Sequence, residues 1–400
     1  MSTTNDRTIV SMDTLGVGAQ NTAKAEHNHS FSKQAAQNLD LVRLNPNSSM
    51  PPPTDHGVVP PVWYSFDLTH RRVQEGGWTH QVTRRELPSS ADIAGVTMRL
   101  TAGSFRELHW HLADEWAIML GGNARITVYS PDGTMFVDDV VEGDLWIFPA
   151  GYPHSIQGTG KDGCEFLLVF NQGDFSEEDT FLITDWMMHT PPEILAKQFG
   201  LDEATIAKIP KADPLYIFPS SVPTQTVAQD RAEAEGRSAG KPHQVFTFKT
   251  SQMKPTITTP AGNVKIIDQS VFPASKKICT GISTIKPGGM REMHWHPNAS
   301  EWQFWIKGQG RMTVFPGQGA ARTMDFKAND VGFVPKMAGH YVENTGKEDV
   351  VFLEMFASPN FSDISLSKWL RALPENIAIA HTNFSAEDLA KISYTETEFK

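Results

Sequence analysis

Short apolar segments separated by glycine and proline turns recur along most of the chain. They are rich in Val, Ile, Phe and Trp, as in ARITVYS from Ala124, DLWIFPAG from Asp144 and EFLLVF from Glu165. Short strands with regular turn signals are typical of an antiparallel sandwich or barrel. Helical sequence follows two of these runs, after Thr190 and after Ile364. The pattern therefore predicts a mainly β fold with short helices after each run of strands.

The pattern of strands and turns occurs twice. RELHWH begins at Arg106 and REMHWH at Arg291, while GDLWIFPAGYPH ends at His154 and NDVGFVPKMAGH ends at His340. The offset between the copies is 185 residues at the first pair of motifs and 186 at the second. Self-similarity at a nearly fixed spacing indicates a duplicated domain.

Composition adds an arm and a linker to the two copies. Residues 1–55 are polar and end in the proline-rich SSMPPPTD, so we predict an N-terminal arm. We expect a first domain over 56–233 and a second over 234–400. Residues 210–244 are rich in Pro and Ala with mixed charges, and we expect them to connect the domains.

The repeated histidines predict a metal site in each copy. Two histidines separated by one residue face the same side of a strand, a glutamate follows four or five residues later, and a third histidine lies 39 residues beyond the glutamate. A single such pair is more often an ordinary surface pair, but here the whole set occurs twice. Three imidazoles and one carboxylate suit six-coordinate manganese or iron with two open positions, whereas closed zinc sites have four ligands. The predicted ligands are His109, His111, Glu115 and His154, and then His294, His296, Glu301 and His340.

Charge and composition exclude some functions. The net charge of −11 argues against a general nucleic-acid surface, and no apolar run approaches the roughly 20 residues that span a bilayer. Cys164 and Cys279 lack the spacing of zinc or redox pairs. Met1 to Val10 are polar and do not resemble a signal peptide, which favours a cytoplasmic protein, although a processed secreted form would look the same.

From about residue 40 to 385 the chain resembles the bicupin oxalate decarboxylases. The stretches 103–122 and 143–154 match the two cupin motifs, 288–308 matches the first again, and 329–344 matches the second with changes. The resemblance implies two tandem cupin domains, each a jelly roll or double-stranded β-helix, with manganese in both sites and dioxygen as co-catalyst. It also implies oxalate as substrate and a homohexamer. Asn329 and Met337 stand where the motif usually has glycine, which makes these two turns uncertain.

Two arginines and two acids complete the predicted sites. Arg106 and Arg291 each precede the first ligand by three residues, and strict strand parity would not put them on the ligand side. The resemblance implies that they stabilise substrate and radical intermediates. FSEEDTF, residues 175–181, reads alone as a solvated loop capped by Ser176. In the family this segment is a mobile lid, and Glu177 stands at the position of its acid.

The second acid is Glu354, in VFLEMF, where the first copy has Leu168. An acid in place of a core leucine is explained if it faces the second metal, and a surface position is the alternative. Phe361 stands where the family often has tyrosine, which weakens the second site as a catalytic centre. We therefore predict an oxalate decarboxylase that turns over at the first site. The alternatives are an oxalate oxidase that forms carbon dioxide and hydrogen peroxide, or a metal-binding bicupin for another substrate.

Overall fold

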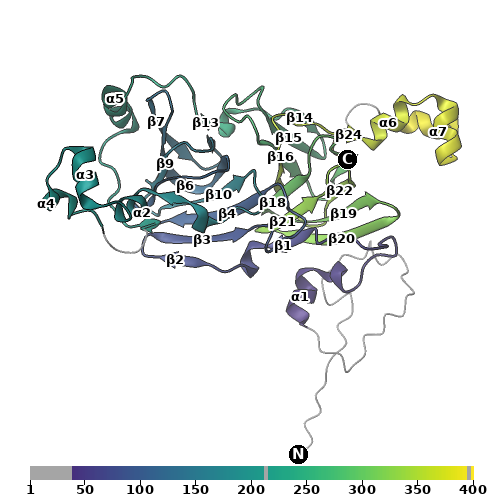
Figure 1. Ribbon diagram of the computed structural model, residues 1–400. Helices are drawn as coiled ribbons and strands as arrows, with labels where there is room; N and C mark the ends of the chain where they lie inside the picture. The colour runs from purple at the N-terminus through teal and green to yellow at the C-terminus, as the bar shows by residue number, and fades with distance from the viewer. Residues whose placement is uncertain (1–37, 211–214, 394–397) are drawn as a thin grey trace, which may run out of the picture.

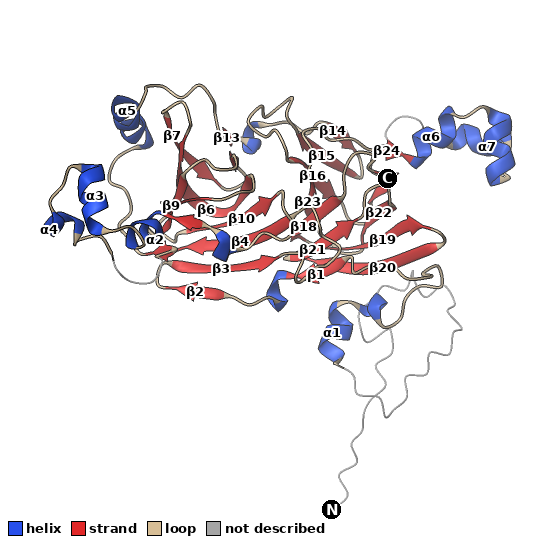
Figure 2. Cartoon of the chain, in the orientation of Figure 1, coloured by secondary structure: helices blue, strands red, loops and turns tan. Residues whose placement is uncertain are grey.

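The computed structural model of the protein describes residues 38–210, 215–393 and 398–400 (Figure 1). The two copies of the repeat lie side by side, the first in purple to teal and the second in green to yellow (Figure 1). Strands dominate both, and helices lie mainly at their edges (Figure 2). The predicted mainly β fold is therefore confirmed.

The first half is built on one continuous antiparallel sheet. Its long strand β6 (Glu115–Tyr129) pairs with β8 (Leu145–Phe148) and β10 (Cys164–Phe170) through its first residues, and with β7 (Met135–Val141) and β9 (His154–Gly158) through its later ones. This strand thereby connects the two walls of the barrel. The remaining strands are β2 (Arg72–Gln74), β3 (Gly77–Val82), β4 (Ala94–Leu100), β5 (Phe105–Trp110), β11 (Phe181–Leu182), β12 (Ile217–Phe218) and β13 (Thr247–Phe248).

The second half has two separate sheets. The five-stranded sheet runs β20 (Ala320–Lys327), β19 (Gln309–Gly317), β22 (Gly339–Asn344), β17 (Met290–Trp295) and β24 (Ile364–Ser365). The seven-stranded sheet runs β1 (Trp63–Ser65), β21 (Asp330–Val334), β18 (Glu301–Lys307), β23 (Val350–Phe356), β16 (Cys279–Ile285), β15 (Gly262–Ile267) and β14 (Ile257–Thr259).

The two halves exchange strands. β1 precedes the first barrel in sequence, but it pairs with β21 of the second. β13 precedes the second barrel, but it pairs with β8 of the first. Upstream of β1, Asn45 and Asn47 hydrogen-bond Asp325 of β20. The domain limits 56–233 and 234–400 remain predictions, and these pairings cross both of them.

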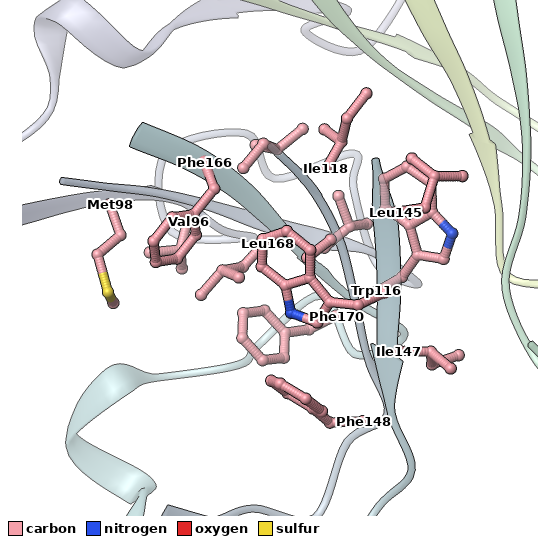
Figure 3. Packing of buried hydrophobic residues seen from close by; sticks show 14 of the residues in the cluster. Val96, Met98, Trp116, Ile118, Leu145, Ile147, Phe148, Phe166, Leu168 and Phe170 are labelled. Atoms are coloured by element: carbon pink, nitrogen blue, oxygen red, sulfur yellow. The ribbon is translucent and has the colours of Figure 1, made fainter. Parts of the chain in front are cut away.

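The core of the first barrel continues into the interface between the halves. Figure 3 shows Val96, Met98, Trp116, Leu168 and Phe170 packed in the first barrel. The same buried cluster includes residues of the second half, among them Trp302 and Phe304. A side-chain carbon at Gly95 would lie 2.6 Å from the Trp302 ring, so only glycine allows this approach. The halves therefore share apolar packing as well as strands.

Short helices follow each barrel, as predicted. α2 (Ile183–Met188), α3 (Pro192–Phe199) and α4 (Glu203–Ile206) follow the first, and α3 begins at a proline where a missing N–H is tolerated. α6 (Leu366–Ala372), α7 (Glu375–Thr382) and α8 (Ala386–Lys391) follow the second, while α1 (Leu39–Leu44) precedes β1. No helix in the described ranges is long and apolar enough to cross a membrane.

The segment expected to link the domains is largely part of the first barrel. β12 pairs with β5, and α5 (Val227–Arg237) packs on β7. Asp230 of α5 accepts a hydrogen bond from Arg125 of β6 at 2.5 Å. A segment rich in Pro, Ala and charged residues resembles a linker, because composition does not reveal long-range partners such as β5, β6 and β7. Residues 1–37 of the predicted arm lie outside the described part.

Candidate metal centres

The four predicted ligands of the first site meet inside the first barrel. His109 lies at the end of β5, His111 just beyond it, Glu115 at the start of β6 and His154 at the start of β9. One ligand atom from each lies within 4.8 Å of all the others, and all four side chains are buried. Pairing of β5 with β9 sets His109 directly opposite His154. Antiparallel pairing thus brings together residues that are 45 positions apart in the sequence.

Each imidazole is oriented by a backbone carbonyl. The Nδ1 atoms of His109, His111 and His154 lie 2.6–2.7 Å from the carbonyl oxygens of Glu107, Ala113 and Tyr152. A carbonyl only accepts, so Nδ1 carries the hydrogen and Nε2 presents its lone pair to the centre of the cluster. This anchoring through the second nitrogen is the usual arrangement in metal-binding histidines.

The electrostatics also fit a cation. Burial, and to a smaller extent the positive charge of the nearby Arg106, holds the pKa of His109 well below its usual value. This imidazole is therefore neutral. Burial alone would raise the pKa of Glu115, but the adjacent imidazoles of His111 and His154 outweigh burial and bring it to about 2. A buried carboxylate among neutral imidazoles is a donor set for a divalent metal.

The second site repeats this arrangement. The ligand atoms of His294, His296, Glu301 and His340 lie within 4.8 Å of one another and are buried. The Nδ1 atoms of the three histidines, in chain order, lie 2.7, 2.8 and 3.1 Å from the carbonyl oxygens of Glu292, Ser362 and Ala338. In this set the Nε2 atoms of all three histidines and Oε2 of Glu301 have no hydrogen-bond partner in the described part of the chain. The Nε2 atoms of His296 and His340 lie 3.0 and 2.8 Å from Oε2 of Glu301, so these atoms converge without bonding, as ligands of a common ion do.

Both arginines lie on the ligand side of their strands, which strict parity did not predict. The pairing of β5 with β9 shifts by one residue between Arg106 and His109, and β17 shifts against β22 at the same place, between Arg291 and His294. The extra residue of a β-bulge reverses the side to which later residues point. Arg106 therefore lines the same cavity as His109, and Arg291 is fully buried beside the second cluster.

Glu177 reaches the first cluster from outside the barrel. It begins a short 3-10 turn, Glu177–Asp179, within the segment 175–181, which we call the lid. Its Oε2 accepts a hydrogen bond of 2.7 Å from the Thr79 hydroxyl, and its Oε1 accepts one from the Tyr216 hydroxyl. Glu177 lines a cavity of about 10 Å³ together with Arg106, Tyr216 and the ligands His109, His111 and Glu115. This volume has room for about one water molecule.

The lid separates this inner cavity from a larger hollow. The outer hollow has a volume of about 680 Å³ and is lined by Trp110, Ser176, Phe181 and Trp186, among others. Phe175 and His111 line both spaces. Phe175 also stacks on Phe170, with ring centroids 3.5 Å apart. The lid is therefore the wall between the metal cluster and the outside.

In the second half, carboxylates surround the arginine. Glu354 is fully buried, accepts a 2.6 Å hydrogen bond from Ser283 and lies 3.5 Å from Nε of Arg291. The alternative of a surface position is thereby excluded for Glu354. Arg291 also donates to Asp363 at 2.5 Å. Burial opposes the charge of Arg291, but Glu354 and Asp363 outweigh it and raise the pKa of the guanidinium.

Sequence reasoning missed three residues of these sites. Tyr216 and Thr79 come from distant segments and carry no local motif. Asp363 did have a signal, because FSE ends at Glu177 and FSD ends at Asp363, with the same offset of 186 as His154 and His340. Asp363 is thus the internal counterpart of the lid glutamate.

Comparison with known proteins agrees with this architecture. The cupin family model matches residues 65–207 and 248–389. Oxalate decarboxylase OxdC of Bacillus subtilis (strain 168) is 46% identical over 351 residues, which cover 88% of this chain and 89% of OxdC. A probable oxalate decarboxylase of Arthroderma benhamiae is 40% identical over 367 residues, 90% of this chain and 88% of that protein.

Solved structures are similar over the same extent. The Bacillus subtilis oxalate decarboxylase at pH 4.6 has a TM-score of 0.88 and 44% identity, covering 92% of this chain and 94% of that one. A structure from work on the Mn(II) centres of the same enzyme has a TM-score of 0.87 and 43% identity, covering 92% and 96%.

The tandem barrels with one three-histidine, one-glutamate cluster each define a bicupin with two candidate metal centres. Within that class, the chain belongs to the bicupin oxalate decarboxylase family of cupins.

Proposed function

We propose that this protein is an oxalate decarboxylase that converts oxalate and a proton into formate and carbon dioxide, with manganese in both clusters and dioxygen as co-catalyst. The observation that carries the proposal is the inner cavity, where an arginine and a carboxyl group face the metal-ligand atoms of the first cluster. An anion-binding cation and a proton donor are the two groups that this reaction needs besides the metal.

The donor sets fit manganese. His109, His111, Glu115 and His154 would hold one ion, and His294, His296, Glu301 and His340 the other. When bound, manganese supplies open positions for substrate oxygens and the one-electron chemistry of the reaction. Buried Nε2 atoms without hydrogen-bond partners at His154, His294, His296 and His340 support this assignment.

Arg106 has the role of binding the substrate carboxylate. No carboxylate in the described part of the chain forms an ion pair with it, and its guanidinium lies 3.8 Å from the centre of the Tyr216 ring. One Nη donates to the Tyr216 carbonyl oxygen at 3.4 Å, and the other donors of the guanidinium are available to a small dianion, which they bind in a planar fork. Loss of carbon dioxide leaves a fragment that must gain a proton at carbon, and Glu177 donates this proton.

We assign turnover to the first site and a supporting role to the second. Arg291 and Glu354 are the matching substrate-side candidates there, but Glu354 and Asp363 already offset the charge of Arg291. An arginine compensated in this way attracts a dianion less than Arg106 does. Asp363 occupies the position that corresponds to the acid Glu177.

The Glu177→Ala variant tests this function. With manganese and oxalate at mildly acidic pH, we expect formate production to fall at least about 100-fold, the lower range for loss of a general acid, while peroxide formation remains. Formate and peroxide are measured together, and Glu178→Ala on the same lid is the matched control that keeps formate as the main product. Unchanged formate in Glu177→Ala would refute the role of Glu177. Peroxide as the main product of the unaltered protein would instead favour the oxalate oxidase alternative.

Absence of both products would favour a metal-binding bicupin for another substrate. For the assembly we propose a homohexamer, supported by exposed apolar side chains at Leu112, Trp186 and Trp369. Light scattering would give the mass directly, and a monomeric mass would refute the hexamer. A cytoplasmic location, proposed from the polar first residues, is checked by fractionating cells.

A further inference from the structure

Two hydroxyl groups from outside the lid hold the carboxyl group of Glu177. Thr79 donates to Oε2 at 2.7 Å, and Tyr216 donates to Oε1. The Thr79 side chain is fully buried. Within the described ranges, Glu177 is the only hydrogen-bond partner of the Thr79 hydroxyl. Most buried hydroxyl groups have such a partner, and the lid in this position satisfies one that would otherwise be unpaired.

Thr79 lies on a rigid element and Glu177 on a weakly attached one. β3 is paired along its length with β4, where Thr79 lies opposite Met98, a residue of the inner cavity wall. In the lid, Glu178 and Asp179 are exposed, and the turn is closed by local bonds to Ser176. The lid is joined to the barrel at its two ends, by the stacking of Phe175 on Phe170 and by the pairing and stacking of Phe181 with Trp110. Between these ends, the contacts of Glu177 are its main attachment to the barrel.

The hydroxyl of Thr79 suits a carboxyl group that gains and loses a proton. A threonine hydroxyl donates to an ionised carboxylate, and it accepts from a protonated carboxyl group by rotating its hydrogen. The same contact can therefore persist before and after proton transfer. An apolar side chain of the same shape, such as valine, supplies neither bond.

We propose that Thr79 is a positioning residue that latches the lid closed and holds Glu177 toward the metal cluster. This inference rests on the proposed function for its effect on products, because that effect requires Glu177 to be the proton donor. The latch itself is a property of the folded chain and can be measured without oxalate.

The test compares Thr79→Val with two matched variants in the manganese-loaded protein. Thr79→Ser keeps the hydroxyl. Thr97→Val removes the hydroxyl of another buried threonine, on the adjacent strand β4. This hydroxyl has no hydrogen-bond partner among the residues that the structure describes. Hydrogen exchange of the lid amides, residues 176–180, is measured by mass spectrometry in all three and in the unaltered protein. Formate and peroxide yields are measured in parallel.

We expect lid exchange to rise about tenfold in Thr79→Val, the factor that corresponds to the loss of one hydrogen bond to a charged group. The ratio of formate to peroxide falls with it, while KM for oxalate changes little. Thr79→Ser and Thr97→Val behave as the unaltered protein. Equal lid exchange in Thr79→Val and Thr97→Val overturns the latch.

The two proposals fail in distinguishable ways. Faster lid exchange with an unchanged product ratio leaves the latch standing and counts against Glu177 as the proton donor. A changed ratio without faster exchange overturns the latch and leaves the role of Glu177 intact. A general loss of stability would increase hydrogen exchange across β3 and β4 as well as in the lid. That outcome would also contradict the proposal that Thr79 acts specifically on the lid.

Discussion

At the scale of single residues, two turn positions of the second barrel carry backbone strain. Met337 and Asn329 have φ angles of +68° and +72°, the left-handed region that favours glycine. Met337 is exposed, whereas Asn329 hydrogen-bonds Asp67 at 2.8 Å and belongs to a residue type that tolerates this conformation. The absence of the usual glycine at these positions therefore affects the two turns unequally.

Met337→Gly should raise the free energy of unfolding by about 1 kcal/mol, because relief of the left-handed strain exceeds the added entropy of the unfolded chain. Asn329→Gly should gain almost nothing, since it also loses the bond to Asp67. Urea unfolding of both variants at one manganese concentration provides the measurement. A loss of stability in Met337→Gly would show that the turn is not strained.

Residue patterns predicted the ligands but not all of their surroundings. His109, His111, Glu115 and His154 were recognisable because the duplication repeats their spacing, and the structure brings them together. The position of Arg106 depended on a bulge, which alternation along a strand cannot reveal. Tyr216 and Thr79 reach Glu177 from segments 39 and 98 residues away, and no local pattern marks them. The catalytic roles of Arg106, Arg291, Glu177 and Glu354 remain predictions.

At the scale of elements, the segment that contains Glu177 in the first copy and Asp363 in the second has diverged between the copies. In the first it forms the lid, and within the described residues the side-chain hydrogen bonds of Glu177 come from hydroxyl groups. In the second, Asp363 precedes β24, and its ion pair with Arg291 fastens the segment to β17. Burial would raise the pKa of Asp363, but Arg291 outweighs it and lowers that pKa. Both segments continue into a short strand paired with β5 or β17, so the difference between them is the ion pair that holds the second.

Asp363→Ala should lower the free energy of unfolding by about 3 kcal/mol, because it leaves the buried guanidinium of Arg291 with Glu354 alone. Glu177→Ala at the matching position should lower it by only about 1 kcal/mol, since it breaks hydrogen bonds to hydroxyl groups. Both are compared by urea unfolding with the same manganese concentration, because bound metal adds to stability. Equal losses would contradict the structural role of the second segment.

At the scale of the whole molecule, strand exchange makes each half depend on the other. Repeats and composition predicted the number of barrels, and their helices follow as expected, because both are local signals. Partner choice is not a local property. Trp63–Ser65 is a strand of only three residues, and its pairing with Asp330–Gly332 shows where it belongs. The boundaries at 55/56 and 233/234 therefore could not have revealed the exchange.

Asp330 of β21 contacts Trp63 of β1, and this contact should make the stability of the protein depend on pH. Its carboxylate accepts hydrogen bonds from the Trp63 indole at 3.0 Å and from the backbone N–H of Lys327 at 2.8 Å. Burial raises the pKa of Asp330 from 3.8 to about 6, and those hydrogen bonds oppose the rise only in part. A group with a raised folded-state pKa contributes stability that is fully present below 3.8 and is lost as the pH rises through about 6.

Asp330→Asn keeps an acceptor for both donors but carries no charge at any pH. Relative to the unaltered protein, the variant should therefore gain about 3 kcal/mol of unfolding free energy as the pH rises from below 3.8 to above about 6. Urea unfolding across this range, with the metal removed from both proteins, gives the difference at each pH. If burial raises the pKa of Asp330, that difference grows with pH. A constant difference would mean that Asp330 keeps an ordinary pKa, and that the contact between β1 and β21 holds the halves together independently of its charge.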